Sequence, residues 1–297
     1  MLRPITALTL LGALPVWGAA DAGVVGPDGR FDLGHDWVQA FAPEGAPARQ
    51  AFPDDAQWQA FLARVQRVLD RGSLADLAAL EAPARAMVNA FQAMPVFAAE
   101  AAWLNERLDY MEVARIAPTS PPEAGASPVP FYQLWLHRLG QRPAPSAAEP
   151  WATNLPTVFT AEELPGSLVW LAEVESSFDP AAKSPVGAAG LFQLMPDTAN
   201  DLGLDLEPED GRLDPHANAQ AAARYLHDLH RRFADWPLAF AAYNAGPTRV
   251  AKLLRQNRAS TYAAIAPDLP AETRMFVPKV LATLTVRAAW TVEGPTP

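Results

Sequence analysis

Residues 168–178 read Leu-Val-Trp-Leu-Ala-Glu-Val-Glu-Ser-Ser-Phe, a helix-prone run in an Ala-rich part of the chain. In a helix each residue turns by about 100°, which brings five positions of this run into one narrow stripe. They are Leu168, Leu171, Ala172, Glu175 and Phe178. Glu173 would point to the opposite side. Glu175 therefore occupies a position where a leucine is expected.

Helical spacing recurs along the chain, while strand-like alternation is nearly absent. One further apolar stripe consists of Trp58, Phe61, Leu62, Val65, Val68 and Leu69. Another consists of Ala222, Tyr225, Leu226, Leu229 and Phe233. More helices are expected over about 74–93, 96–115 and 129–139, each bounded by Pro, Gly or Ser. The fold class that follows is all-α.

Helix punctuation is denser in the second half of the chain. Asp214 and Pro215 predict an N-cap and a first-turn proline for a helix that runs to about Phe233. Pro237 is expected to open a short helix that ends at Gly246, and Pro247 to open the next. Short helices packed at steep angles leave clefts, so polar residues at their C-terminal ends can face a groove.

Length and composition indicate an organised protein with more than one part. The chain has 297 residues, of which half are apolar and 19% are charged, which excludes wholesale disorder. The 30 prolines predict several stiff connections. The Pro-rich segment 141–150 is the best candidate for a boundary, because its prolines forbid a continuous helix. We predict a helical region over 21–150 and a catalytic domain over 151–297.

The first twenty residues have the pattern of a secretory signal. Arg3 precedes an apolar run over 5–17, and Gly18-Ala19-Ala20 follows it. The run is too short to span a bilayer comfortably, and a buried N-terminal helix is the competing interpretation. We expect residues 1–20 to be a signal peptide cleaved near Ala20. The chain has no cysteine, so neither a disulfide nor a lipid-bearing cysteine is expected.

A carboxyl in an apolar stripe has the raised pKa that a general acid needs near neutral pH. Glu175 meets that requirement, as in an enzyme that protonates the leaving oxygen of a glycosidic bond. A second carboxylate is harder to find in the sequence, because Glu173 faces away and Asp179 precedes a proline as a helix stop. One carboxyl acting first as acid and then as base is the simpler scheme. On spacing alone, the alternative is a glutamate at a helix end that reaches solvent or pairs with an arginine such as Arg249.

The histidines and tryptophans of the sequence are predicted to have structural roles rather than to bind a metal. His227 and His230 have helical spacing but no acidic or cysteine partner at ligand spacing, so no metal site is expected. The sequence indicates no cofactor. Trp58, Trp103 and Trp135 are predicted to anchor the core.

Several separate motifs resemble the soluble lytic transglycosylase catalytic domain, the goose-lysozyme-like glycoside hydrolase family 23. They are Leu164-Pro165 through Asp179-Pro180, Ser184, Gly187-Ala188-Ala189-Gly190-Leu191-Phe192-Gln193, Pro196-Asp197-Thr198-Ala199, Ala223-Arg224-Tyr225-Leu226, Ala241-Ala242-Tyr243-Asn244-Ala245-Gly246 and Pro270 through Leu281. The match spans about 155–290. The Leu-Pro start and the Glu-Thr-Arg to Val-Pro-Lys ending look most like the membrane-bound lytic transglycosylase D branch.

The resemblance implies a lysozyme-like helical domain that cleaves the β-1,4 bond between N-acetylmuramic acid and N-acetylglucosamine in peptidoglycan. Glu175 matches the family's catalytic acid and base, which leaves a 1,6-anhydro product without consuming water. The residues that match the glycan groove are Ser184, Gly190, Gln193, Tyr243 and Asn244. Tyr243 is expected to donate a hydrogen bond to the glutamate. Gly187 and Gly190 are expected to let the backbone approach the sugar.

Two residues depart from the family pattern. Phe192 replaces a common methionine and stiffens an apolar wall. Phe276 replaces a common tyrosine, so one hydrogen bond near the glutamate is lost.

The function that we predict is a periplasmic peptidoglycan lytic transglycosylase. The alternative is a wall-binding scaffold with little or no turnover. Glycan strands are the expected partner, and protein partners in the cell wall or a secretion apparatus stay unidentified. The net charge of −10 argues against nucleic acid and gives no reason to expect an anionic membrane surface. No membrane span is expected.

Overall fold

The computed structural model describes residues 55–92, 98–116, 127–184 and 186–295. The predicted signal peptide and most of the 117–128 loop lie outside these residues, as do the side chains of Trp58 and Leu62. The described part is helical apart from one short antiparallel pair, β1 (Trp290–Thr291) and β2 (Gly294–Pro295). The all-α prediction is confirmed.

The elements divide into those before and those after the Pro-rich segment 141–150. Before it lie α3 (Asp55–Arg71), α4 (Leu74–Ala79), α5 (Glu81–Gln92), α6 (Ala98–Ile116) and α7 (Tyr132–Gly140). After it lie α8 (Ala148–Asn154), α9 (Pro156–Ala161), the 3₁₀ helix η3 (Gly166–Trp170), α10 (Leu171–Ser176), α11 (Pro196–Asp201), η4 (Gly211–Leu213), α12 (Pro215–Phe233), α13 (Trp236–Ala245), α14 (Pro247–Asn257), α15 (Tyr262–Ile265), η5 (Ala266–Asp268) and α16 (Ala271–Ala288).

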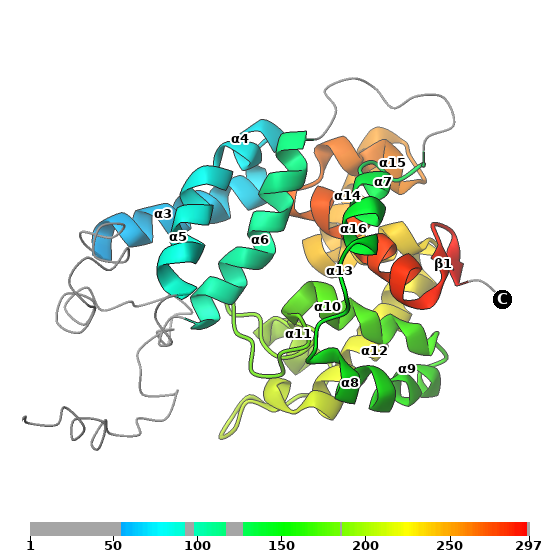
Figure 1. Ribbon diagram of the computed structural model, residues 1–297. Helices are drawn as coiled ribbons and strands as arrows, with labels where there is room; N and C mark the ends of the chain where they lie inside the picture. Colours follow the sequence, from blue (N-terminus) through cyan, green and yellow to red (C-terminus); the bar gives the residue numbers. More distant parts are fainter. Residues whose placement is uncertain (1–54, 93–97, 117–126, 185, 296–297) are drawn as a thin grey trace, which may run out of the picture.

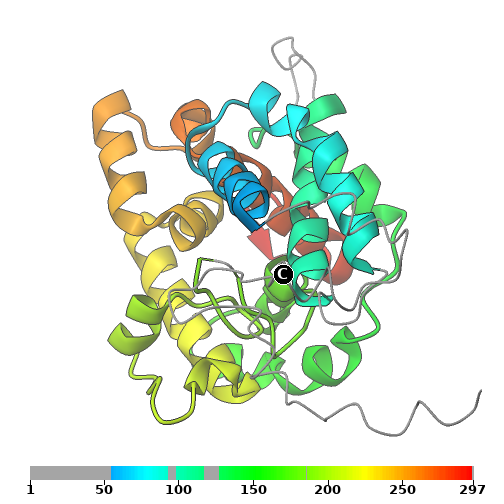
Figure 2. The same ribbon diagram turned by 90° about the vertical axis from the view of Figure 1, so that its left-hand side faces the viewer.

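Helix α16 connects the two groups. It packs against α3, α6 and α7 on one side and against η3, α10 and α13 on the other (Figure 1). Its residues from Met275 to Leu284 are all buried. The view in Figure 2 shows α3 lying close to α16 from a second direction, as their contacts require. The elements from both sides of 141–150 share one buried apolar cluster.

Charged residues fix α6 against α7 and α16. Asp109 on α6 accepts hydrogen bonds from Arg138 at 2.7 Å and from Arg142 at 2.7 and 2.8 Å. Lys279 of α16 lies 3.6 Å from the same carboxylate and over the rings of Tyr110 and Trp135. Burial alone would raise the pKa of Asp109, but these cations lower it well below its ordinary value. The position of α6 is therefore held by charge as well as by apolar packing.

Most predicted helix ends agree with the structure. The Asp214 carboxylate accepts from the Ala217 N–H at 2.7 Å, and α12 runs from Pro215 to Phe233. Helices α13 and α14 begin within one residue of the predicted starts. The predicted helix over 74–93 is two helices, because the chain turns at Leu80 after the capped turn of α4.

Among the described residues, no helix is long and apolar enough to cross a membrane. Trp103 and Trp135 are buried, which confirms them as core anchors. The segment 141–150 breaks the helical run as expected, although Pro150 lies inside the first turn of α8. The division of the chain into domains stays a prediction.

Candidate active site

The run that contains Glu175 is a short composite helix. It starts as the 3₁₀ turn η3, continues as α10, and ends where Ser177 and Phe178 take left-handed backbone angles, with φ of 53° and 63°. The predicted helix over 168–178 is therefore too long at its C-terminal end. The stripe survives, because Leu168, Leu171 and Phe178 are fully buried. Glu175 lies in the same stripe and is only partly exposed.

Glu175 faces charged residues from distant parts of the chain. Burial raises the pKa of its carboxyl well above the ordinary value. Arg107 lowers that pKa, Glu272 and Glu106 raise it, and Lys279 lowers it again. Within the described residues, no hydrogen bond or ion pair joins the Glu175 carboxyl to another side chain. Burial thus favours the protonated form of this carboxyl, and no side chain of the described residues occupies it.

Arg107 on α6 lies between two of these carboxylates. Its guanidinium is 2.8 Å from a Glu106 oxygen and 3.5 Å from a Glu272 oxygen. It also lies 4.9 Å from the centre of the Trp103 ring. The Ser177 hydroxyl, at the end of α10, donates to Glu106 at 3.3 Å. Burial, partly offset by Arg107 and Lys279, raises the pKa of Glu106 to about 7.

Two other carboxylates lie close enough to Glu175 in the folded chain to affect its pKa, and the sequence analysis did not identify them. Glu106 comes from α6 and Glu272 from the first turn of α16. Glu272 belongs to a motif that was recognised, but Glu106 and Arg107 lie about seventy residues before Glu175 on a different helix. Both carboxylates are engaged by Arg107, whereas Glu175 is not. Glu106 and Glu272 therefore influence the pKa of Glu175 through their charges and are themselves engaged by Arg107.

Glu173 has the structural role that its position predicts. Its two oxygens accept from the Arg287 guanidinium at 2.9 Å each, and both side chains are 10% exposed. The same guanidinium donates to the carbonyls of Arg142 and Pro143 at 3.1 Å. Glu173 therefore fastens α10 to the end of α16 and to the Pro-rich segment. Asp179 is also structural, since its carboxylate accepts from the Ala181 N–H at 2.9 Å.

The loop over 182–194 folds back on itself beside α10. The Ser184 hydroxyl accepts from the Ala188 N–H at 2.9 Å. The Gln193 amide donates to the carbonyls of Ala182 at 3.1 Å and Gly190 at 2.9 Å. Two of the predicted groove residues thus shape the loop through their own hydrogen bonds, and the carbonyl oxygen of the Gln193 amide is left over.

Side chains from η4 and α12 fix this loop from behind. Buried Asn218 accepts from the Phe192 N–H at 2.8 Å, and Arg212 donates to the carbonyls of Gly187 and Leu194 at 2.7 and 2.9 Å. Sequence reasoning assigned Asn218 and Arg212 no role. Their signal is weak, because single polar residues near helix starts usually serve as caps.

Gly190 has a clear packing reason. Its φ is +84°, and a Cβ there would lie 2.0 Å from the Arg212 carbonyl oxygen and 2.6 Å from the Asn218 amide nitrogen. The glycine is buried, so the close approach that requires it is to the protein's own backbone. Gly187 also has a positive φ, of 92°, but a Cβ there meets only Pro196 at 3.9 Å.

The Tyr243-Asn244 pair lies at the end of α13. The Tyr243 hydroxyl donates to the Phe192 carbonyl at 2.6 Å, so its proton is not given to Glu175 as expected. The Glu175 charge still reaches it, because Glu175 raises the pKa of Tyr243 after the larger effect of burial. Asn244 accepts from the Thr273 hydroxyl at 2.6 Å, which ties α13 to the turn that carries Glu272. Of the two residues, Tyr243 is the one that interacts electrostatically with the glutamate.

No group of three or more His, Asp or Glu side chains in the described part of the chain is placed to hold a metal ion. His230 stacks on Trp236 with ring centres 3.9 Å apart.

Comparison with known proteins agrees with this geometry. Residues 160–265 match the Transglycosylase SLT domain family, and this range contains Glu175 and all five predicted groove residues. The segment that carries Glu175 is therefore similar to a transglycosylase SLT domain. The resemblance to lytic transglycosylases is thereby confirmed.

Curated relatives include both branches named by the sequence motifs. Membrane-bound lytic murein transglycosylase D of Escherichia coli K12 is 40% identical over 140 residues, which is 46% of this chain and 31% of the relative. The soluble lytic murein transglycosylase of Salmonella typhimurium is 40% identical over 121 residues, or 38% of this chain and 19% of the relative. The chain thus spans about a third or less of the length of these relatives.

Two solved structures resemble the chain at low TM-scores. The 70 kDa soluble lytic transglycosylase of Escherichia coli has a TM-score of 0.42 at 22% identity, covering 84% of this chain and 46% of that one. Lytic transglycosylase Slt of Pseudomonas aeruginosa has a TM-score of 0.40 at 25% identity, covering 78% and 32%.

Proposed function

We propose that the protein is a peptidoglycan lytic transglycosylase and that Glu175 is its only acid and base. The observation that supports this proposal is the buried carboxyl of Glu175, which no side chain of the described residues engages, inside a segment that matches a transglycosylase SLT domain. The named relatives are murein transglycosylases, and a protein with a net charge of −10 would hold such a polymer by hydrogen bonds and shape rather than by bulk attraction.

The proposed reaction uses one carboxyl twice. Protonated Glu175 gives its proton to the oxygen that leaves C1 of N-acetylmuramic acid, while the N-acetyl group of that sugar assists from the substrate side. The Glu175 carboxylate then takes the proton of the C6 hydroxyl, whose oxygen bonds to C1. The product ends in a 1,6-anhydro sugar, the proton from the C6 hydroxyl regenerates protonated Glu175, and no water is consumed.

The charges around Glu175 suit both halves of that cycle. Burial and the carboxylates of Glu106 and Glu272 favour the protonated form, which the first step needs. Arg107 and Lys279 keep the ionised form from becoming too costly once the proton has left. We propose that Arg107 is a positioning residue, because it acts on Glu175 through its charge and anchors both neighbouring carboxylates.

The assignments of Ser184, Gly190, Gln193, Tyr243 and Asn244 to the glycan groove are part of the proposal. The hydrogen bonds of these residues to the surrounding loop and helices support a rigid groove wall more directly than they support sugar contacts. We also propose that residues 1–20 are a signal peptide, that the protein works in the periplasm, and that the region over 21–150 completes the active site of the domain over 151–297 through α6.

Digestion of purified sacculi by the wild-type protein tests the function. Mass analysis of the released fragments should show anhydro ends, which lack the mass of one water relative to reducing ends. Reducing ends would identify a hydrolase and would overturn the single-carboxyl scheme. The absence of soluble fragments would favour the wall-binding scaffold.

A further inference from the structure

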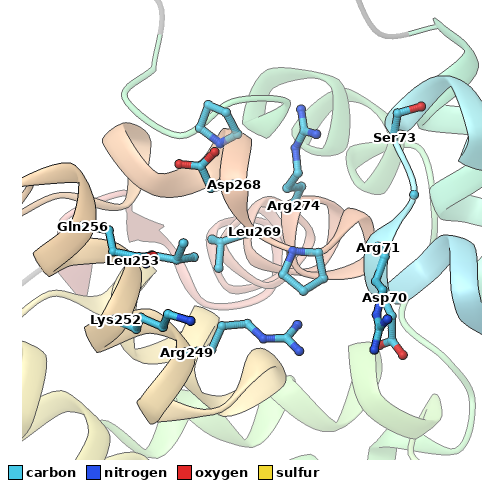
Figure 3. A pocket seen from close by; sticks show the side chains of 13 residues that line it. Asp70, Arg71, Ser73, Arg249, Lys252, Leu253, Gln256, Asp268, Leu269 and Arg274 are labelled. Carbon is cyan, nitrogen blue, oxygen red and sulfur yellow. The ribbon is translucent and has the colours of Figure 1, made fainter.

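A positively charged pocket lies beside the active site, between the corner that joins α3 to α4 and the region from α14 to the start of α16. Its volume is about 550 Å³. Its lining includes four basic side chains, from Arg71, Arg249, Lys252 and Arg274, and the two acidic residues Asp70 and Asp268. Figure 3 shows Arg249 extending from α14 across the pocket toward Asp70 and Arg71. The surplus of two positive charges contrasts with the protein's net charge of −10.

The basic side chains of this pocket have no close polar partner among the described residues. In the described part of the chain, the side chains of these four basic residues form neither an ion pair nor a hydrogen bond. Elsewhere most arginines near carboxylates are paired, as Arg138 and Arg287 are. Asp268 is already engaged by the Asn257 amide at 2.9 Å. Half-buried Arg274 has its pKa lowered mainly by burial, which marks a cation that gains from an anionic ligand.

The pocket shares its framework with the active site. Pro270 and Arg274 line the pocket on either side of Glu272, which contacts Arg107. Asp70 of the pocket raises the pKa of Glu272. Thr273, in the same turn of α16, bonds to Asn244 of the proposed groove. A group attached to a glycan held at Glu175 would therefore meet this pocket as its neighbour.

We propose that the pocket binds the carboxylates of a peptide attached to the glycan strand, an inference that rests on the proposed function. Its mixed lining favours a peptide, because four cations fit carboxylates and Asp70 can accept from an amine. A polyanion such as nucleic acid would meet two carboxylates here and a negative protein beyond. The pocket makes the N-terminal region a determinant of substrate choice, since Asp70 and Arg71 come from α3.

The affinity of an inactive variant for sacculi tests whether the pocket binds peptide carboxylates, because no cleavage takes place. Glu175→Gln protein would be sedimented with intact sacculi and with sacculi stripped of peptides by an amidase. The test variant adds Arg249→Gln and Lys252→Gln. The matched control adds Arg255→Gln and Arg258→Gln, which remove the same charge from exposed positions at the end of α14, outside the pocket.

The expected result is a roughly ten-fold weaker affinity of the test variant for intact sacculi, as for the loss of about one charge-assisted hydrogen bond. Its affinity for stripped sacculi, and that of the control for both, should change less than about two-fold. Removal of the peptide exposes the lactyl carboxylate of N-acetylmuramic acid. If the test variant lost affinity equally for intact and stripped sacculi, the pocket would bind that carboxylate and the proposal would be overturned. No weakening, or an equal effect in the control, would overturn it as well. A wild-type protein that binds both sacculi but cleaves neither would fail the proposed function and leave this binding result standing.

Discussion

The two faces of α10 place chemically identical groups in opposite surroundings. Glu173 faces the end of α16, where Arg287 takes both of its oxygens in a two-pronged ion pair. Glu175 faces α6, where Arg107 is already engaged by two other carboxylates. The first glutamate stabilises the fold through its ion pair with Arg287, whereas burial raises the pKa of the second well above its ordinary value. The role of each glutamate therefore depends on whether a neighbouring cation is available to pair with it.

The largest expected effect is the loss of catalytic rate when Glu175, on the face of α10 toward α6, is replaced. Glu175→Gln should lower the initial rate of sacculus digestion by at least about a hundred-fold, because the amide keeps the shape but has no acidic proton. Glu173→Gln is the matched control and should keep most of the activity. The measurement is the release of soluble fragments over time, with circular dichroism to show that both variants fold. Substantial activity in Glu175→Gln would remove Glu175 from the role of the acid.

A second prediction concerns Arg107. Arg107→Gln should lower the rate roughly ten-fold, the effect of about 1.4 kcal/mol in the transition state. Arg107 lowers the pKa of Glu175, so its loss raises that pKa further and moves the alkaline limb of the pH–rate profile to higher pH. Arg107→Lys keeps the charge and should restore much of the original profile. An unchanged alkaline limb in Arg107→Gln would show that Arg107 only supports the fold.

Replacing Glu173, on the face of α10 toward Arg287, should lower the stability of the protein. Glu173→Gln removes the charge that Arg287 pairs with, in a site where both side chains are 10% exposed. The free energy of unfolding should fall by about 2 kcal/mol, the typical cost of leaving a charged group with a weakened partner. Urea denaturation followed by circular dichroism measures this. A variant as stable as the wild type would show that the ion pair is not needed to hold α10.

The smallest effect is on the stability of the Glu175→Gln protein. Because the folded state raises the pKa of Glu175, ionisation of this group costs stability as the pH rises above the ordinary carboxyl value of 4.5. The variant cannot ionise, so it should be more stable than the wild type at pH 7, with a difference that shrinks toward pH 4. Thermal melts across this range test the sign. A difference that grows on acidification would mean that the folded protein favours the ionised form.

The local sequence was informative where neighbours in the chain decide the structure. The stripe through Leu168 and Phe178 is buried as predicted, and Asp214 caps its helix. The C-terminal end of α10 was not predicted, because the residues that take left-handed backbone angles there, Ser177 and Phe178, are not glycines. Tyr243 was expected to bond to Glu175, but the Phe192 carbonyl from the folded loop competes for its proton.

The charged surroundings of Glu175 could not be predicted in the same way. Arg107 and Glu106 reach the site only because α6 is fixed against α16 through Asp109 and Lys279. That contact joins segments about 170 residues apart, and no spacing rule connects them. The charged pocket has the same origin, since its basic residues come from α3, α14 and α16. Local patterns predicted the acid, and tertiary packing determines its pKa.

Titration of Glu175 in the folded protein tests its assignment as the acid most directly. Carbon-13 NMR of glutamate side-chain carboxyls, with Glu175→Gln and Glu173→Gln used to assign the two resonances, follows each group as the pH changes. We predict that Glu175 titrates well above 4.5, because its carboxyl is buried on the face of α10 that is turned toward α6. A Glu175 pKa at or below 4.5 would contradict its assignment as the acid.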